Sequence, residues 1–405
     1  MSVRPEFTAP TSEETPAGHL TYKRSHSPYE RFVESEGIPI VRGVGVYDTR
    51  EVELGQWDRV GGRGAYLFLD GIGSQKGMYL VEVPARGELN VQRHLFDEFY
   101  LVIEGRGTTE AWKNGSNRKH SFEWATGSLF TVPMNANFRL VNAGSSPALL
   151  LAANNCPPLM NIFQDANFVL NPPLDEMPRF DESEDFFKPK TDIQADEVRG
   201  RAAIESNVFA DIINCDLPLD NQRAPGFRRI QPYFHGFLRD QGTGGFIAQY
   251  PTGRYSKAHY HASGAVLVCL QGEGYSFNWR IEHGPTPWKD GKGDQVMIQP
   301  YKQGGLVAAA PGGGNWFHQH FSVGAEPMRF INYWGGPDGQ WGNAAEETGG
   351  EDVKAGNIYG IEEGGRSINY WMEDPYIREL FAKRLRENGV EPTMPERLYV
   401  KPEGR

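Results

Sequence analysis

The stretch GMYLVEVPARGELNVQRHLFDEFYLVIEGRGTTEAW, residues 77–112, alternates apolar and polar residues between glycine-containing turns. Alternation with a period of two is typical of half-buried strands, because successive side chains on a strand point to opposite faces. Turn signals continue beyond it, at Arg86-Gly87, Glu104-Gly105, Asn114-Gly115, Ala125-Thr126-Gly127 and Ala143-Gly144. This spacing predicts a sandwich or barrel of short antiparallel strands over residues 71–155.

A second β-rich block, from residue 246 to 334, resembles the first. Each block contains a strand that ends in a glycine turn, IEGRG at 103–107 and LQGEG at 270–274. Such internal repetition indicates two copies of one barrel. The 48 glycines and 28 prolines among 405 residues also favour many short strands over long helices. We therefore expect an all-β protein.

The remaining segments connect or flank these two blocks. We divide the chain into an N-terminal arm and interface segment (1–70), a first barrel (71–155), a linker with short helices (156–230), a second barrel (231–340) and a tail with a helix (341–405). Sequence patterns predict helices near 28–36 and at 375–386, the latter ending at Asn388-Gly389. An amphipathic segment at 196–209 suggests a helix within the linker.

Charge and composition exclude several classes of protein. A formal net charge of -11 lacks the basic surface that nucleic acid or anionic lipid would need. No apolar run is long enough for a membrane span, and the N-terminus lacks the apolar core of a signal peptide. The three cysteines are widely spaced, which fits reduced thiols. We expect a cytoplasmic protein.

Two histidine doublets carry the strongest chemical signal in the chain. HYH at 259–261 and HQH at 318–320, just beyond the glycine-rich run 311–314, hold four of the ten histidines. Residues two apart on a strand point to the same face, so each doublet can direct two imidazoles into one cavity. Imidazole binds zinc, iron, copper and nickel. The pattern favours a metal site, and the alternative is four hydrogen-bonded histidines without a metal.

Side chains near the doublets are candidates for contact with a substrate. An arginine clamp between aromatic walls would suit an aromatic substrate that carries a carboxylate. Arg254, shortly before His259, is the residue that we expect to contact the substrate, and Tyr260 is a further candidate catalytic residue. The alternative is that these side chains only pack the barrel.

The order of these motifs resembles that of the cupin superfamily, and the whole chain resembles a bicupin. The cupin pattern is a glycine, a His-x-His doublet, a glutamate and a second glycine, followed later by Pro-x-Gly, a histidine and an asparagine. The resemblance covers roughly residues 75–155 and 245–335. It implies two double-stranded β-helix (jelly-roll) barrels in one chain, and a homo-oligomer that associates through barrel faces and exchanged arms.

The C-terminal copy keeps the histidines of this pattern. Its matching residues are Gly253, His259, His261 and Gly272. Ala265 stands where the family has its glutamate. The resemblance implies a metal held by His259, His261 and His318, with His320 as a fourth ligand or as a base beside the metal.

The N-terminal copy has lost half of these positions. Gln92 replaces the first histidine of the doublet, and Phe138 replaces the later histidine, so only His94 and Glu98 remain. The resemblance therefore implies a structural barrel without tightly bound metal, and one metal per chain.

A three-histidine centre without a carboxylate resembles the thiol, diketone and gentisate-type dioxygenases among cupins. We therefore predict an oxidoreductase with Fe(II), or else Mn, Ni, Cu or Zn, that uses O2 to oxidise a small hydroxylated or carboxylated substrate, aromatic compounds included. One alternative is a non-redox lyase, isomerase or decarboxylase in which the metal acts as a Lewis acid. A metal-free binding bicupin is the other.

Overall fold

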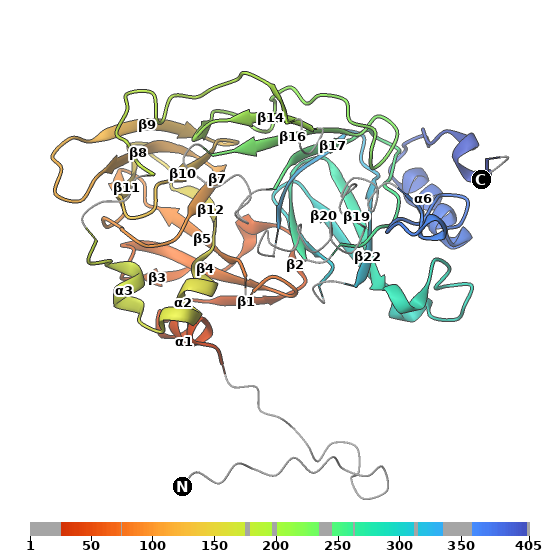
Figure 1. Cartoon of the computed structure of the whole chain (residues 1–405), viewed down its shortest axis with the longest axis horizontal. Coiled ribbons are helices and arrows are strands. Elements are labelled where there is room, and N and C mark those ends of the chain that lie inside the picture. The colour runs from red at the N-terminus through yellow and green to blue at the C-terminus, as the bar shows by residue number, and fades with distance from the viewer. Residues whose placement is uncertain are drawn as a thin grey trace, which may run out of the picture.

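A computed structural model describes residues 26–73, 75–174, 179–196, 201–234, 245–261, 264–311, 315–334 and 359–402. Two β-barrels lie side by side in it, the N-terminal one on the left and the C-terminal one on the right of Figure 1. Residues 1–25 of the expected arm, and the first part of the expected tail up to residue 358, lie outside the described residues.

The N-terminal barrel has eight strands that follow one another along the chain. They are β5 (Gly77–Val83), β6 (Gly87–Glu88), β7 (Glu98–Glu104), β8 (Arg106–Trp112), β9 (His120–Ala125), β10 (Leu129–Val132), β11 (Asn137–Asn142) and β12 (Ala148–Asn154). One sheet contains the order β5-β12-β7-β10 and the other the order β6-β11-β8-β9. This interleaved antiparallel order defines a jelly roll. The predicted all-β fold class, with jelly-roll barrels, is confirmed.

The C-terminal barrel repeats the same topology. Its strands are β17 (Ile247–Tyr250), β18 (Ala265–Gln271), β19 (Glu273–Arg280), β20 (Met297–Lys302), β21 (Leu306–Ala309), β22 (Trp316–Ser322) and β23 (Met328–Trp334). They pair in the orders β17-β23-β18-β21 and β20-β19-β22. The place of the second strand is taken by an irregular segment that meets β22 at two isolated bridges, Tyr255 with Phe321 and His259 with His318. The internal repeat is therefore confirmed in three dimensions.

Short strands from outside the barrels tie them together. The N-terminal sheet is extended by β1 (Ile40–Gly43), β3 (Gly55–Trp57) and β4 (Gly62–Leu69), and the C-terminal sheet by β13 (Gln194–Asp196), β14 (Arg201–Glu205) and β16 (Arg228–Tyr233). In addition, β2 (Gly45–Val46) crosses to pair with β21, and β15 (Val208–Phe209) crosses back to pair with β10. These crossings run along the bottom and the top of Figure 1.

The helix expected at 196–209 is wrong. Strands β14 and β15 occupy this segment, with β14 parallel to β16 and β15 antiparallel to β10. Open sheet edges on both barrels supply backbone partners there, and such tertiary pairing outweighs a local amphipathic pattern. The helices of the linker lie earlier, at α2 (Cys156–Phe163) and α3 (Ala166–Leu170).

The two terminal helices agree with the sequence. α1 spans Pro28–Ser35 and starts with a capping box formed by Ser27 and Glu30. α6 spans Pro375–Glu387, capped by Asp374 and followed by Gly389 at φ 66°. Short 3-10 turns lie at Thr49–Glu51, Ile281–His283, Gly293–Gln295, Ile361–Glu363 and Glu396–Tyr399.

One apolar core is shared by both barrels. Phe99 on β7 lies 4.9 Å from Tyr333 on β23 and 5.6 Å from Phe234 of the linker, measured between ring centroids. These residues belong to one buried cluster that also includes Leu151 of the first barrel and Ile331 of the second. Burial of apolar area on both sides of this contact holds the barrels together.

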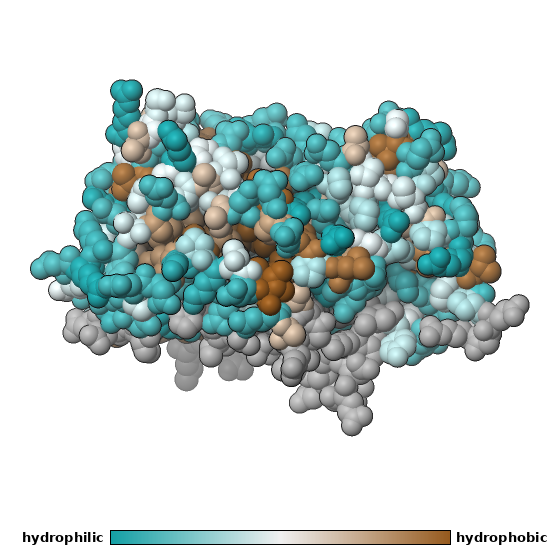
Figure 2. Space-filling model, turned by 90° about the horizontal axis from the view of Figure 1, so that it is seen from above, coloured by the Kyte–Doolittle hydropathy of each residue, from teal (hydrophilic) through white to brown (hydrophobic). Residues whose placement is uncertain are grey.

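The surface above β14 and β16 is mostly hydrophilic. In Figure 2 most hydrophobic residues, coloured brown, form separate spots. A larger group lies toward the middle of the left half, on the side of the N-terminal barrel. Among the described residues, no helix has the length and apolar character needed to span a membrane. All three cysteines, Cys156, Cys215 and Cys269, are free.

Candidate metal centre

Three histidines of the C-terminal barrel lie together. His259 and His261 come from the irregular segment before β18, and His318 comes from β22. The bridge between the two elements exchanges hydrogen bonds from His259 N to His318 O (3.1 Å) and from His318 N to His259 O (2.9 Å). One ligand atom from each of the three side chains lies within 4.8 Å of the others. Three ligand atoms this close together could hold a single ion.

Backbone contacts fix the orientation of two of these rings. The Nδ1 atom of His259 lies 3.1 Å from the Lys257 carbonyl, and that of His318 lies 3.3 Å from the Trp316 carbonyl. A carbonyl can only accept, so Nδ1 carries the proton and donates it, leaving the Nε2 lone pair free. Hydrogen bonds of this kind orient metal-binding histidines in proteins.

The electrostatic surroundings keep these imidazoles neutral. Burial lowers the pKa of His259 well below its usual range, and the cation of Arg223 lowers it further. For His318, burial again has the largest effect on the pKa, followed by the neighbouring His261 and His320. A neutral imidazole can bind a metal ion, whereas an imidazolium cannot.

His320 lies beside this group. It shares the inward face of β22 with His318, and their ring centroids are 5.6 Å apart. Its Nδ1 atom is 2.8 Å from the hydroxyl of Ser276, its partner on the neighbouring strand β19. Burial, followed by Arg223, lowers the pKa of His320 to about 3. His320 is thus a neutral ring held by Ser276 at the edge of the three-histidine group.

No carboxylate belongs to the histidine group among the described residues. Ala265 begins β18 at the position where Glu98 begins β7 in the first barrel. The two polar residues on the inward face nearby are Asn278 and Gln299, which bond to each other at 2.9 Å. The group therefore consists of neutral ligands alone.

Gln319, between the two histidines of β22, points to the opposite face. Its amide donates to the Ser256 carbonyl at 2.9 Å and to the Glu373 carboxyl group at 3.2 Å. Glu373 also accepts a short hydrogen bond from the hydroxyl of Tyr255. The back of the metal-site strand is thus bonded to the C-terminal segment that leads into α6.

Arg254 and Tyr260 are occupied by protein contacts. The guanidinium of Arg254 donates to the Pro225 carbonyl at 2.6 Å and to Thr393 at 3.2 Å. The ring of Tyr260 meets Phe317 edge to face at 5.3 Å, on the side of the chain opposite to the two histidines that flank it. Arg254 therefore holds a loop and the tail, and Tyr260 packs against the outside of β22.

Sequence reasoning missed Arg223, which lies in the segment assigned to the linker. Its cation lowers the pKa of His259, His318 and His320, and its backbone carbonyl accepts a hydrogen bond from the amide of Lys257, two residues before His259, at 3.1 Å. Its Nη1 atom is buried and has no hydrogen-bond partner in the described chain. The only sequence signal was an isolated arginine in a polar turn, far from either doublet.

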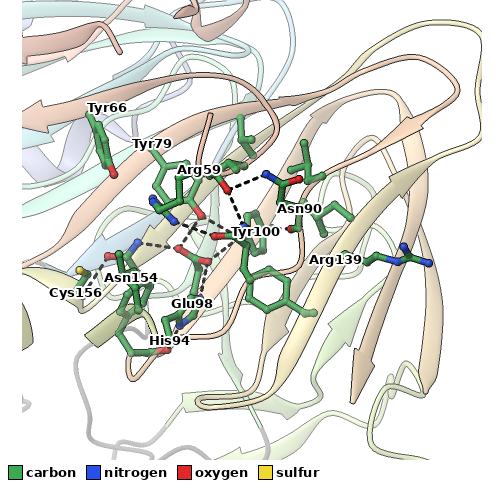
Figure 3. Close-up of a pocket in the computed structure, with 18 of the residues that line it drawn as sticks. Arg59, Tyr66, Tyr79, Asn90, His94, Glu98, Tyr100, Arg139, Asn154 and Cys156 are labelled. Atoms are coloured by element: carbon green, nitrogen blue, oxygen red, sulfur yellow. Dashed lines mark hydrogen bonds and ion pairs between the residues drawn. The ribbon is translucent and has the colours of Figure 1, made fainter. Parts of the chain in front are cut away.

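The corresponding position of the N-terminal barrel holds a closed hydrogen-bond network (Figure 3). Glu98 accepts hydrogen bonds from Tyr79 (2.8 Å), Asn154 (2.8 Å) and Tyr100 (2.6 Å), and His94 lies 3.1 Å away. The other ring nitrogen of His94 faces the Phe96 carbonyl at 3.0 Å. Both nitrogens of His94 and both oxygens of Glu98 are thus occupied by protein groups.

Comparison with known proteins gives a fold likeness only. No family model and no curated protein sequence matches the chain. Solved structures of oxalate decarboxylase from Bacillus subtilis include a variant at 10% identity with a TM-score of 0.45, covering 73% of this chain and 78% of the other. A formate complex of the Lactobacillus farciminis oxalate decarboxylase has 11% identity and a TM-score of 0.45, with coverage of 73% and 86%. Likeness at this level carries no information on activity.

Proposed function

We propose that the C-terminal barrel binds one divalent metal ion through His259, His261 and His318. The observation that carries the proposal is the geometry of three imidazoles whose ligand atoms lie within 4.8 Å of one another, with His259 and His318 buried and His261 half-buried. The donor set fits Fe(II), Mn, Ni, Cu and Zn, all of which accept imidazole ligands. Fe(II) is the ion that suits the chemistry proposed below. His320 is the fourth ligand or the base beside the ion.

We propose that this centre is an enzyme active site for a small anionic substrate. A bound divalent ion would supply Lewis acidity there and, with iron, electron transfer to O2. Because three neutral imidazoles leave the charge of such an ion uncompensated, the site favours anionic oxygen ligands such as a hydroxy acid, an enolate or a phenolate. The reaction class that follows is O2-dependent oxidation of a small hydroxylated or carboxylated compound.

Non-redox decarboxylation or lyase chemistry is the second candidate. The observation in its favour is Arg223, an arginine cation beside the histidines that could hold a carboxylate or stabilise the negative charge formed when one is lost. The names of the oxalate decarboxylases with a similar fold agree with this class. Their likeness to this chain concerns the fold alone.

One experiment separates the two classes. The protein is purified without oxygen, its metals are quantified, and it is incubated with hydroxylated aromatic acids, diketones, and hydroxy and dicarboxylic acids while O2 and CO2 are followed. Near one equivalent of iron with substrate-dependent O2 uptake supports the oxygenase. CO2 release without O2 uptake, from a zinc, nickel or manganese protein, supports the decarboxylase. Absence of any bound metal contradicts both.

We also propose that the chain forms a homo-oligomer. The expectation comes from the resemblance to cupins, and sedimentation velocity on the purified full chain tests it. A single species with the mass of one chain, 45.4 kDa, would contradict it.

A further inference from the structure

A loop of the linker is folded against the candidate metal centre. It spans residues 219–228 and is closed by a bridge between Leu219 and Arg228. The backbone nitrogens of Asp220 and Asn221 both donate to the Phe227 carbonyl, at 2.9 and 3.1 Å. The side chain of Asn221 accepts from Gly226 at 2.7 Å. These internal bonds give the loop one defined conformation.

Arg223 lies at the turn of this loop, and its backbone is held by contacts with the segment that carries His259 and with the C-terminal segment. Its carbonyl accepts from the Lys257 amide at 3.1 Å and from the Tyr370 hydroxyl at 3.5 Å. Arg254 bonds to the Pro225 carbonyl two residues further along. Since Lys257 also fixes the ring of His259 through its carbonyl, the loop and the metal-site segment are parts of one assembly.

The side chain of Arg223 is a cation without an acidic partner in the described chain. Burial lowers the pKa of Arg223 to about 10, with a further contribution from Arg229. That value still leaves the guanidinium charged at neutral pH. The residue as a whole is half-buried, but its Nη1 donor is shielded from solvent and has no partner in the described chain, which is unfavourable for a charged group. Its persistence beside three histidines points to a ligand that is negatively charged.

Arg229 provides a second set of free donors. It lies on β16 opposite Ala248 of β17 and is only 2% exposed. One of its nitrogens, Nη2, bonds to Asp220 at 2.7 Å and to Gln222 at 2.8 Å. Its Nε and Nη1 atoms are buried and have no partner in the described chain. Ala248 packs inside the C-terminal barrel, so Arg229 faces the same interior.

Tyr250, on β17, is close enough to both arginines to respond to their charges. Both cations act on the phenol of Tyr250, which is hydrogen-bonded to Ser256. The hydroxyl of Ser256 in turn accepts from the backbone nitrogen of His320 at 3.0 Å. Arg223 and Arg229 thus contribute three unpartnered guanidinium nitrogens around Tyr250, which is linked through Ser256 to His320, and neither arginine belongs to the barrel motifs.

We propose that Arg223 and Arg229 form an anion-binding subsite, and that the substrate carries two acidic groups, one for the metal ion and one for this arginine pair. The part of this inference that concerns the metal ion rests on the proposed function. A carboxylate, phosphonate or sulfonate has the oxygen atoms to accept from all three free nitrogens at once. A second acidic group would also balance more of the positive charge of the ion and Arg223 than a single one does.

The test compares pairs of acids that differ only in the second acidic group. Zinc-loaded protein, which is inert to redox chemistry, is titrated calorimetrically with malonate, succinate and glutarate and with propanoate, butanoate and pentanoate. We expect at least one diacid to bind ten-fold or more tightly than its monoacid. Arg223→Met should abolish this preference for the diacid and leave the affinity for monoacids within about two-fold of the wild-type value. Arg229→Met should reduce the preference for the diacid.

Arg228→Met is the matched control. Arg228 is adjacent to Arg229 in sequence, but its side chain is exposed and bonds to the Leu217 carbonyl, so the variant loses the same charge outside the barrel. It should keep the preference for diacids. Equal affinities for the members of all three pairs, or equal loss in the Arg223 and Arg228 variants, would overturn the proposal and assign the free donors to water.

Failure of the proposed function has a different signature. In that case elemental analysis finds no zinc in the loaded wild-type protein. A carboxylate that still binds this metal-free protein, and binds more weakly after Arg223→Met but not after Arg228→Met, would retain the arginine subsite and remove the metal half of the proposal.

Discussion

At the scale of single residues, a few substitutions distinguish two barrels of the same fold. His259, His261 and His318 form the proposed ligand set of the second barrel, while the first barrel has Gln92 and Phe138 where the cupin pattern has histidines. In the first barrel, Glu98 accepts hydrogen bonds from three neighbouring side chains and is paired with His94. A fully hydrogen-bonded carboxylate has no lone pair left for a metal ion, so the two interiors have different chemistry.

Removal of a ligand histidine should remove the metal. We expect His259→Ala and His318→Ala to lower metal content to less than about one tenth of the wild-type value, because two imidazoles bind a divalent ion much more weakly than three. His94→Ala should leave metal content close to that of the wild type. Elemental analysis of the folded protein measures each. Metal loss in the His94 variant, but not in the other two, would contradict this assignment and place the metal in the N-terminal barrel.

His94→Ala is not judged by metal content alone, since it also removes one of the four side chains bonded to buried Glu98, which should lower the free energy of unfolding by about 1–3 kcal/mol. His94→Gln keeps a donor near Glu98 and serves as the milder variant. Both are compared by urea unfolding before their metals are measured.

The role of His320 is tested by a conservative change. His320→Asn should retain more than about half of the metal, because the ring lies outside the group of three and is bonded to Ser276. Substrate turnover should fall by a factor of about a hundred to ten thousand, the range for loss of a positioned base. Complete loss of metal would identify His320 as a fourth ligand instead.

At the scale of elements, the C-terminal segment supports the metal-site strand from outside. Glu373, just before α6, contacts Gln319 of β22 and Tyr255 of the segment before the histidines. Tyr255 also meets Tyr399 of the last 3-10 turn, at 3.0 Å between hydroxyl oxygens. The inward face of β22 carries the histidines, and the outward face carries this polar contact with the tail.

Glu373 makes the stability of this contact depend on pH. Burial raises the pKa of Glu373 from 4.5 to about 8, so the folded protein holds a proton there that the unfolded chain releases above its ordinary pKa. The contribution of Glu373 to the free energy of unfolding is therefore fully present below pH 4.5. It is lost as pH rises to about 8, by roughly 1.4 kcal/mol per pH unit. Glu373→Gln should remove this contribution to the dependence of the unfolding free energy on pH. Urea unfolding at pH 5.5, 6.5 and 7.5 measures it, and an unchanged slope in the variant would contradict the assignment.

At the scale of the whole molecule, the barrels form one cooperative unit. The crossed strands β2 and β15, together with the apolar cluster around Phe99 and Tyr333, connect them through backbone hydrogen bonds and buried area. The loop that carries Arg223 lies between β15 of the first barrel and β16 of the second. The proposed substrate site therefore depends on the linker as well as on the C-terminal barrel.

Phe99→Ala tests this cooperativity. Loss of a fully buried phenylalanine between the barrels should lower the free energy of unfolding by about 3–5 kcal/mol. Unfolding should remain a single transition in calorimetry, with metal released at the same temperature. Ile162→Ala, on the exposed surface of α2, is the control and should change stability by less than about 0.5 kcal/mol. Two separate transitions in the Phe99 variant would show barrels that unfold independently.

Local sequence patterns by themselves determined the two β-rich repeats, the two terminal helices and the histidine doublets, since strand alternation, capping residues and His-x-His spacing all act over a few residues. The jelly-roll topology was an expectation from the resemblance to cupins. Tertiary structure alone decided the rest. Residues 201–205 and 208–209 became strands because two sheet edges offered partners, and Arg254 became a support for a loop. Arg223 and Glu373 reached opposite sides of the metal-site strands only through packing between segments distant in sequence. No local sequence pattern predicts which distant residues a charged side chain in a linker will contact, because only the folded chain brings them together.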